Sequence, residues 1–134
     1  MELGNSLEEF IENTQTYEAE SVKDQIEFLR QRKYDPVSSM YLYYWSDACP
    51  MIGSGLLDYY RCPYKVFDYM QKVYTPVLVC AEPSLHPYRL GREKVFYPGK
   101  TFTARIWLIN DHYYDIPEAL LSWKIQDKTN GEIF

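Results

Sequence analysis

The run Met40-Tyr41-Leu42-Tyr43-Tyr44-Trp45 is the strongest indication of fold class in this chain. Nearly every side chain in it is apolar or aromatic, as in a strand that is buried on both faces of a parallel sheet. A long amphipathic helix precedes it, and a loop with two glycines and a second helix over 63–73 follow. Helix, buried strand, loop and helix form the repeating unit of an α/β barrel or a doubly wound sheet.

The first helix is expected to begin after Ser6, because Ser6 and Glu9 have the spacing of a capping box. Asp35 is expected to stop it, since Pro36 pushes the preceding residue out of the α region. Pro63 suits the first turn of the second helix. Both helices carry an apolar stripe at helical spacing: Leu7, Phe10, Ile11, Thr14, Val22, Ile26 and Leu29 in the first, and Tyr64, Phe67, Met70 and Val73 in the second.

Beyond Pro76 the pattern changes to short strands punctuated by prolines. Alternation is clearest over 101–109, and Asn130-Gly131 is a tight-turn dipeptide. Trp107 and Trp123 fit strand periodicity and are expected in the core of a sandwich. The expected strands are 77–80, 94–97, 101–109 and 119–125, a spacing typical of an antiparallel sandwich of which part is present.

Composition excludes several classes of partner. The chain has 134 residues, with 19 acidic against 14 basic side chains and a net charge of −5. Nucleic acid is not expected as a partner, because neutralising phosphates needs a basic face. Mean hydropathy is −0.43, and no apolar run approaches the roughly 18 residues of a membrane span, so no membrane partner is expected. Residues 1–10 do not resemble a signal peptide, which slightly favours the cytoplasm and leaves the compartment open.

Asp47 is the leading candidate for a functional side chain. It follows the expected strand directly, at the end where α/β barrels and open parallel sheets place functional groups. A turn or cap role before Pro50 is the alternative. Tyr43, Tyr44 and Trp45 bracket the strand end, and a chain with 14 Tyr and 3 Trp suits a sugar-binding surface.

Other side chains with chemical potential have plainer explanations. Asp58 is expected to anchor loop amides and Asp68 to face solvent. Ser54 lies between Gly53 and Gly55 but lacks the frame of a nucleophile elbow.

No metal or cofactor is expected. Cys49, Cys62 and Cys80 are not spaced as metal ligands; free thiols are favoured, and a Cys49–Cys62 bridge stays open. His86 and His112 are isolated from other ligand types. Neither a phosphate loop nor a dinucleotide fingerprint occurs.

These residues resemble glycoside hydrolase family 2, in its β-mannosidase and exo-β-glucosaminidase branch. The resemblance covers nearly the whole chain in the family's order. It rests on six stretches: 26–38, 43–50, 57–61, 74–79, 107–111 and 120–125.

The resemblance implies an α/β plus β fold. Residues 1–75 would be the C-terminal part of a TIM-barrel catalytic domain, ending in its last helix, strand and helix. Residues 76–134 would begin the immunoglobulin-like β-sandwich that follows. Family members are retaining glycosidases with a pair of catalytic Glu residues, and both would lie before Met1. The expected partners are a β-linked glycoside and the remainder of the parent polypeptide.

The resemblance also implies a role for the strand end. The family has Trp-x-x-Asn-Asp there, and this chain has Tyr43 at the Trp position, Ser46 at the Asn position, and Asp47 kept. Asp47, Tyr43 and Trp45 would then line the sugar subsite, with no catalytic residue in this chain and no activity of the chain alone. Two alternatives remain: a stand-alone carbohydrate- or protein-binding module, and a non-functional gene fragment.

Overall fold

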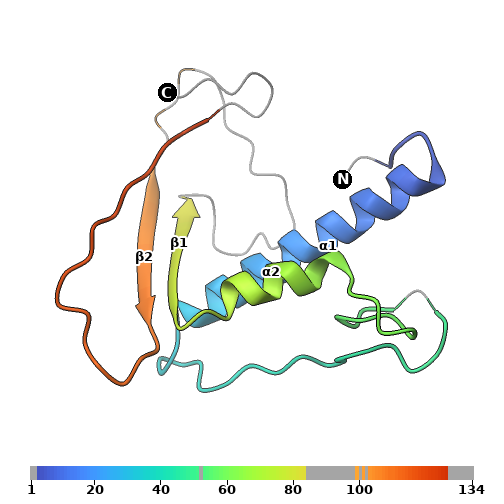
Figure 1. Ribbon diagram of the computed structural model, residues 1–134. Helices are drawn as coiled ribbons and strands as arrows, with labels where there is room; N and C mark the ends of the chain where they lie inside the picture. The colour runs from blue at the N-terminus through green and yellow to red at the C-terminus, as the bar shows by residue number, and fades with distance from the viewer. Residues whose placement is uncertain (1–2, 52, 84–98, 100, 102, 127–134) are drawn as a thin grey trace.

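The computed structural model describes residues 3–51, 53–83, 99, 101 and 103–126. Its elements follow in the order α1 (Leu7–Arg30), α2 (Lys65–Val73), β1 (Val77–Pro83) and β2 (Ala104–Asn110) (Figure 1). Of the described helices, neither is long and apolar enough to cross a membrane.

Helix α1 confirms the first predicted helix and its cap. The Ser6 hydroxyl accepts a hydrogen bond from the Glu9 amide at 3.2 Å, and the Glu9 carboxylate accepts one from the Asn5 amide at 2.6 Å. The helix ends at Arg30 and not at Asp35. It ends early because the chain turns sharply afterwards, with Tyr34 at a φ of 68°.

The two helices run in the same direction. At the start of α2, the Lys65 amide donates to Gln15 Oε1 at 3.4 Å, near the middle of α1. At the end of α2, the Val73 carbonyl accepts from Arg30, the last residue of α1. Helix α2 begins at Lys65 with Tyr64 as its N-cap, so Pro63 precedes the helix and does not lie in its first turn.

Two parallel helices need a connection that returns along them, and residues 31–64 provide it (Figure 1). The predicted buried strand over 40–45 lies in this connection, and the prediction is wrong: the stretch contains no strand. Met40 packs against the helices, whereas residues 41–45 all have exposed side chains. A strand needs a neighbour for its backbone groups, and this stretch has none among the described residues; the bridge that follows it joins Ser46 to Leu57.

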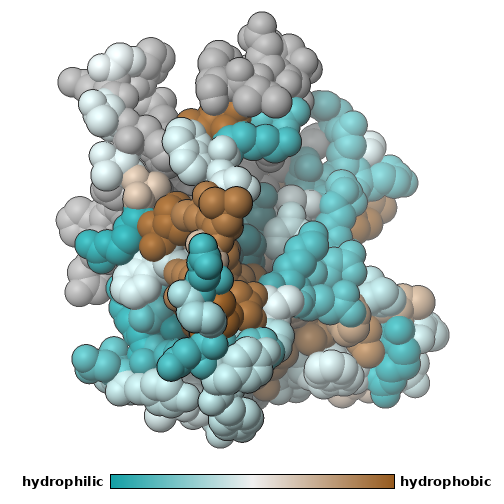
Figure 2. Space-filling view, turned by 60° about the vertical axis from the view of Figure 1, so that its left-hand side comes forward, coloured by the Kyte–Doolittle hydropathy of each residue, from teal (hydrophilic) through white to brown (hydrophobic). Residues whose placement is uncertain are grey.

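Strands β1 and β2 form a two-stranded antiparallel sheet with Leu78 opposite Ile109 and Cys80 opposite Trp107. These four side chains share one face, which is the covered one. The opposite face carries the pairs Val79–Leu108 and Ala81–Ile106 and is exposed. Figure 2 turns this side of the molecule forward and shows hydrophobic residues gathered at the surface there.

The structure confirms two of the predicted strands, with β1 longer than 77–80 and β2 shifted to Ala104–Asn110. The predicted strand over 119–125 is wrong, since this segment has no strand and Trp123 is 77% exposed. Trp107 does pack against the sheet's core. The predicted strand over 94–97 and the turn at Asn130-Gly131 lie outside the described residues.

Buried apolar side chains form two separate clusters on either side of residue 76. One joins the helices to the loop between them, through Ala19, Ile26, Leu56, Val66, Met70 and Val73. The other lies on the sheet, through Leu78, Cys80 and Ile109. The chain therefore has a helical unit and a sheet unit, each with an apolar core of its own.

Candidate functional site

Asp47 lies inside the molecule. Only 4% of its surface is exposed, and its amide donates to the Leu57 carbonyl at 3.0 Å. Its carboxylate accepts two hydrogen bonds, at Oδ1 from the Gly55 amide at 3.2 Å and at Oδ2 from the Tyr64 hydroxyl at 2.8 Å. The carboxylate thus joins the returning connection, the glycine loop and the N-cap of α2.

The glycines of this loop leave room for the carboxylate. A Cβ atom on Gly53 would lie 2.0 Å from Asp47 Oδ1, and one on Gly55 would lie 2.9 Å from it. Both separations are shorter than real Cβ atoms show, so a side chain at Gly53 displaces the carboxylate. The Gly53-Ser54-Gly55 stretch is therefore a cradle for Asp47, a role that the sequence pattern did not predict.

The electrostatics of this site keep Tyr64 protonated. Burial, the hydrogen bond to Asp47 and the negative charges of Asp47, Asp58 and Glu18 raise the pKa of Tyr64 to about 12. Burial and the charge of Asp47 also raise the pKa of Glu18 above its ordinary value. Tyr64 is therefore a hydrogen-bond donor at neutral pH and not a base, because its proton is held by the neighbouring carboxylates.

The two aromatic candidates lie on the surface. Tyr43 is 87% exposed, and its ring packs edge-on against Tyr44 with centroids 4.3 Å apart. Trp45 is 63% exposed and meets Phe67 of α2 edge-on at 6.4 Å. The Trp45 carbonyl accepts from the Leu56 and Leu57 amides. The backbone at Trp45 is therefore fixed, while most of the indole surface is available to a ligand.

The remaining side chains take structural roles. Asp58 Oδ1 accepts from the Cys62 amide at 2.8 Å, as expected for a loop anchor, and Asp68 is exposed.

The three cysteines form no disulfide: Cys49 and Cys62 are exposed and free, and Cys80 is buried and free. Within the described ranges, no group of three or more His, Cys, Asp or Glu side chains could hold a metal ion. His86 lies outside those ranges.

The arrangement suits binding more than proton transfer. The inner part is a carboxylate whose two hydrogen-bond donors are neutral, and it holds a loop and a helix start in place. The outer part offers aromatic rings with polar tips, which pack on apolar faces and hydrogen-bond at their edges. The sequence pattern does not predict Tyr64 as a partner of Asp47, because the two are 17 residues apart and the pattern places Tyr64 on the apolar stripe of the second helix.

The chain was compared with protein-family models, with curated proteins and with solved structures, and nothing in any of the three matches it.

Proposed function

We propose that this chain is the C-terminal segment of a retaining, β-mannosidase-like glycoside hydrolase that acts on β-linked glycosides. It supplies part of the wall of the sugar subsite and not the catalytic Glu pair. The parallel helix pair carries this proposal, together with the aromatic run 41–45 in the connection between the helices, which Asp47 follows.

The direction of the helices supports an α/β origin. Helices that follow one another in a β/α barrel are parallel, because a strand runs back between them. Here α1 and α2 are parallel, and the connection holds an extended run of aromatic side chains with no strand neighbour among the described residues. Neighbouring strands of a barrel would pair this backbone.

The candidate residues then divide the work at the subsite. Tyr43 and Trp45 have the free ring surface that stacking on a pyranose requires. Gly55 and Tyr64 hold the carboxylate of Asp47, and Asp47 thereby fixes the position of the neighbouring segment that carries the two rings. In the parent enzyme Asp47 therefore acts on the subsite as a positioning residue.

The experiment is to express the uninterrupted reading frame that contains this sequence and to assay it on 4-nitrophenyl β-glycosides, the β-mannoside first. Trp45→Ala is expected to raise KM about tenfold, since an aromatic contact of this kind contributes about 1 kcal/mol or somewhat more. Asp47→Ala is expected to lower kcat/KM further, because it releases the whole segment.

Tyr113→Ala is the matched control, because Tyr113 is an exposed aromatic residue in the segment after β2. Its kinetics should equal those of the unchanged enzyme. A frame that hydrolyses no β-glycoside, or a Trp45→Ala variant with unchanged kinetics, would contradict the proposal.

A stand-alone binding module is the second candidate, and the exposed aromatic surface favours it. Tyr41, Tyr43, Trp45 and Tyr60 are all exposed on the connection between α1 and α2. This function predicts cooperative unfolding of the 134 residues and measurable affinity for a β-linked oligosaccharide by calorimetry. Absence of saccharide binding by the cooperatively folded chain would rule it out.

A further inference from the structure

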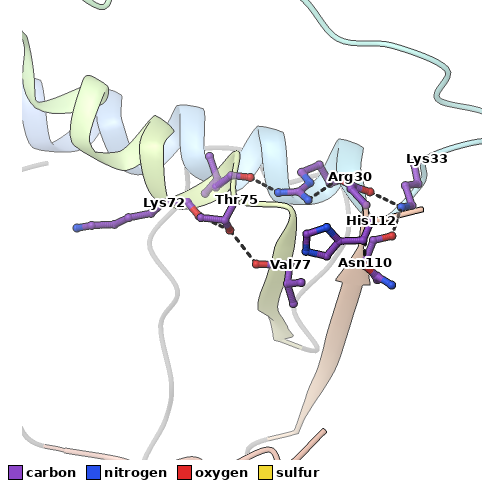
Figure 3. A network of polar contacts seen from close by, with 9 residues as sticks. Arg30, Lys33, Lys72, Thr75, Val77, Asn110 and His112 are labelled. Atoms are coloured by element: carbon purple, nitrogen blue, oxygen red, sulfur yellow. Dashed lines mark hydrogen bonds and ion pairs between the residues drawn. The ribbon is translucent and has the colours of Figure 1, made fainter. Parts of the chain in front are cut away.

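The helical unit and the sheet unit meet through polar side chains. Their apolar clusters are separate, and the bridging hydrogen bonds between described residues come from Arg30 and Lys33 (Figure 3) and from Gln31, at and just after the end of α1. Arg30 is 5% exposed, donates to the Val73 carbonyl of α2 and pairs with Asp111 Oδ2 at 2.5 Å. The buried guanidinium of Arg30, at the end of α1, therefore contacts both α2 and Asp111, the residue after β2.

Asp111 is the receiving group on the sheet side. Its carboxylate also pairs with Lys33, whose ammonium donates to the Asn110 carbonyl at 2.8 Å. The Asp111 amide donates to the Pro76 carbonyl at 2.9 Å, just before β1. The backbone of Asp111 is thus linked to the end of β2 and to the residue before β1. Two cations from the helical unit, Arg30 and Lys33, bind its carboxylate.

We propose that the ionised carboxylate of Asp111 is the joint that holds the sheet on the helix pair. When this carboxylate or its charge is lost, the sheet is released and the helix pair stays folded. An isolated two-stranded sheet is marginal in water, so β1 and β2 depend on what holds them to a larger core. The helix pair has a core of its own. The joint makes folding of the sheet conditional on the helical unit. This inference does not rest on the proposed function.

A second contact across the junction is weaker. Gln31 Nε2 donates to Cys80 Sγ at 3.4 Å, and Gln31 Oε1 is buried with no hydrogen-bond donor for it among the described residues. Sulfur is a poor acceptor, whereas hydrogen bonds between ionised groups are the strong ones. The Asp111 contacts therefore dominate the polar junction.

The ionisation of the groups around the joint follows from their contacts. Partial burial raises the pKa of Asp111, but the hydrogen bonds from Lys33 and Arg30 outweigh burial and bring it below its ordinary value of 3.8. Stability from this pair is therefore fully present above pH 3.8 and is lost as the pH falls through the lowered pKa. Other ionisable groups interact around this junction: Lys23, Glu27 and Arg30 of α1 act on Cys80 of β1, and Arg30 acts on Tyr74 after α2. Burial raises the pKa values of Tyr74 and Cys80, which are neutral in acid.

The test is residue-resolved amide hydrogen exchange of the full chain at neutral pH, with Asp111→Asn beside the unchanged protein. Exchange of the β1 and β2 amides is expected to rise about tenfold or more, the effect of losing a hydrogen bond between charged groups. Exchange of the α1 and α2 amides should stay within about twofold. Asp115→Asn is the matched control, because this exposed residue carries the same charge.

Lys33→Met provides a second variant that leaves Arg30 and Asp111 paired. It should raise exchange in the sheet alone and by less than Asp111→Asn does. Unchanged exchange in β1 and β2 of the Asp111→Asn variant would overturn the proposal. An equal rise in the helices and the sheet would overturn it too, because the two units would then open together. Neither result depends on glycosidase activity.

Discussion

A buried charged residue binds each end of α2, but these two residues have different kinds of partner. At the N-terminal end, Asp47 binds Tyr64 and Gly55, which are neutral and belong to the same unit. At the C-terminal end, Arg30 binds the Val73 carbonyl and the carboxylate of Asp111 from the other unit. A negative group at a helix start and a positive group at its end both suit the helix dipole.

The two ends of α2 therefore respond differently to the loss of a partner. The Asp47 end is closed within residues 47–64, so that it needs nothing from the sheet. The Arg30 end depends on a carboxylate that is partly exposed and belongs to the other unit. Removing a partner at the first end disturbs the candidate site, and removing one at the second end disturbs the junction.

The largest effect is expected from breaking the C-terminal end directly. Arg30→Met leaves the Val73 carbonyl and the Asp111 carboxylate without their donor, which costs about 3 kcal/mol of unfolding free energy in urea titration. Arg32→Met is the control, because its guanidinium donates to the Phe28 carbonyl of α1, within the helical unit. Equal losses for the two variants would mean that Arg30 does not bridge the units.

The N-terminal end is expected to respond slightly less. Asp47→Ala leaves the Tyr64 hydroxyl and the Gly55 amide unpaired in the interior, at a cost of about 2 kcal/mol in the same titration. Gly53→Ala should destabilise the unchanged protein and cost much less in the Asp47→Ala background, since the atom that its Cβ meets is gone. Additive losses would show that the cradle does not surround the carboxylate.

Alkaline titration separates the two ends further. The pKa of Tyr64 is raised to about 12, from an ordinary 10. The folded state therefore holds this proton more tightly, so that its stability is complete below pH 10 and falls between pH 10 and 12. Tyr64→Phe should lower the free energy of unfolding by about 1 kcal/mol at neutral pH, because one neutral hydrogen bond is lost. As the pH rises from 10 to 12, its free energy of unfolding should fall less than that of the unchanged protein. A parallel decline in both proteins would refute the Tyr64–Asp47 bond.

The smallest effect is expected at the surface pair between the helices. Glu12 pairs with Lys65 at the start of α2, and Glu12 is well exposed. Glu12→Gln should change the free energy of unfolding by less than about 0.5 kcal/mol, because water and salt screen such pairs. A larger loss would mean that the helices are held mainly by surface charge and not by the buried residues at the ends of α2.

Local signals in the sequence predicted part of the fold. The Ser6–Glu9 capping box placed the start of α1, and alternation placed β2 to within a few residues. The stretch 40–45 has strand composition but no strand, because composition cannot supply the neighbouring strand that its backbone needs. Trp123 likewise fits strand periodicity and is exposed.

The candidate site was predictable in its residues but not in its geometry. Asp47 was singled out for its place after an aromatic run, which says nothing about burial. Its partners come from 8 and 17 residues further along, and contacts at that separation are set by how the connection folds back. The Arg30–Asp111 pair spans 81 residues and has no local signal.

Amide hydrogen exchange at Gly55 tests most directly whether Asp47 is the buried anchor of the candidate site. Its amide donates to Asp47 Oδ1 within the interior, so we predict exchange at least about tenfold slower than at Ser54, with the difference lost in Asp47→Ala. Equal exchange at Gly55 and Ser54 in the unchanged protein would contradict the account, because the carboxylate would then not hold the loop.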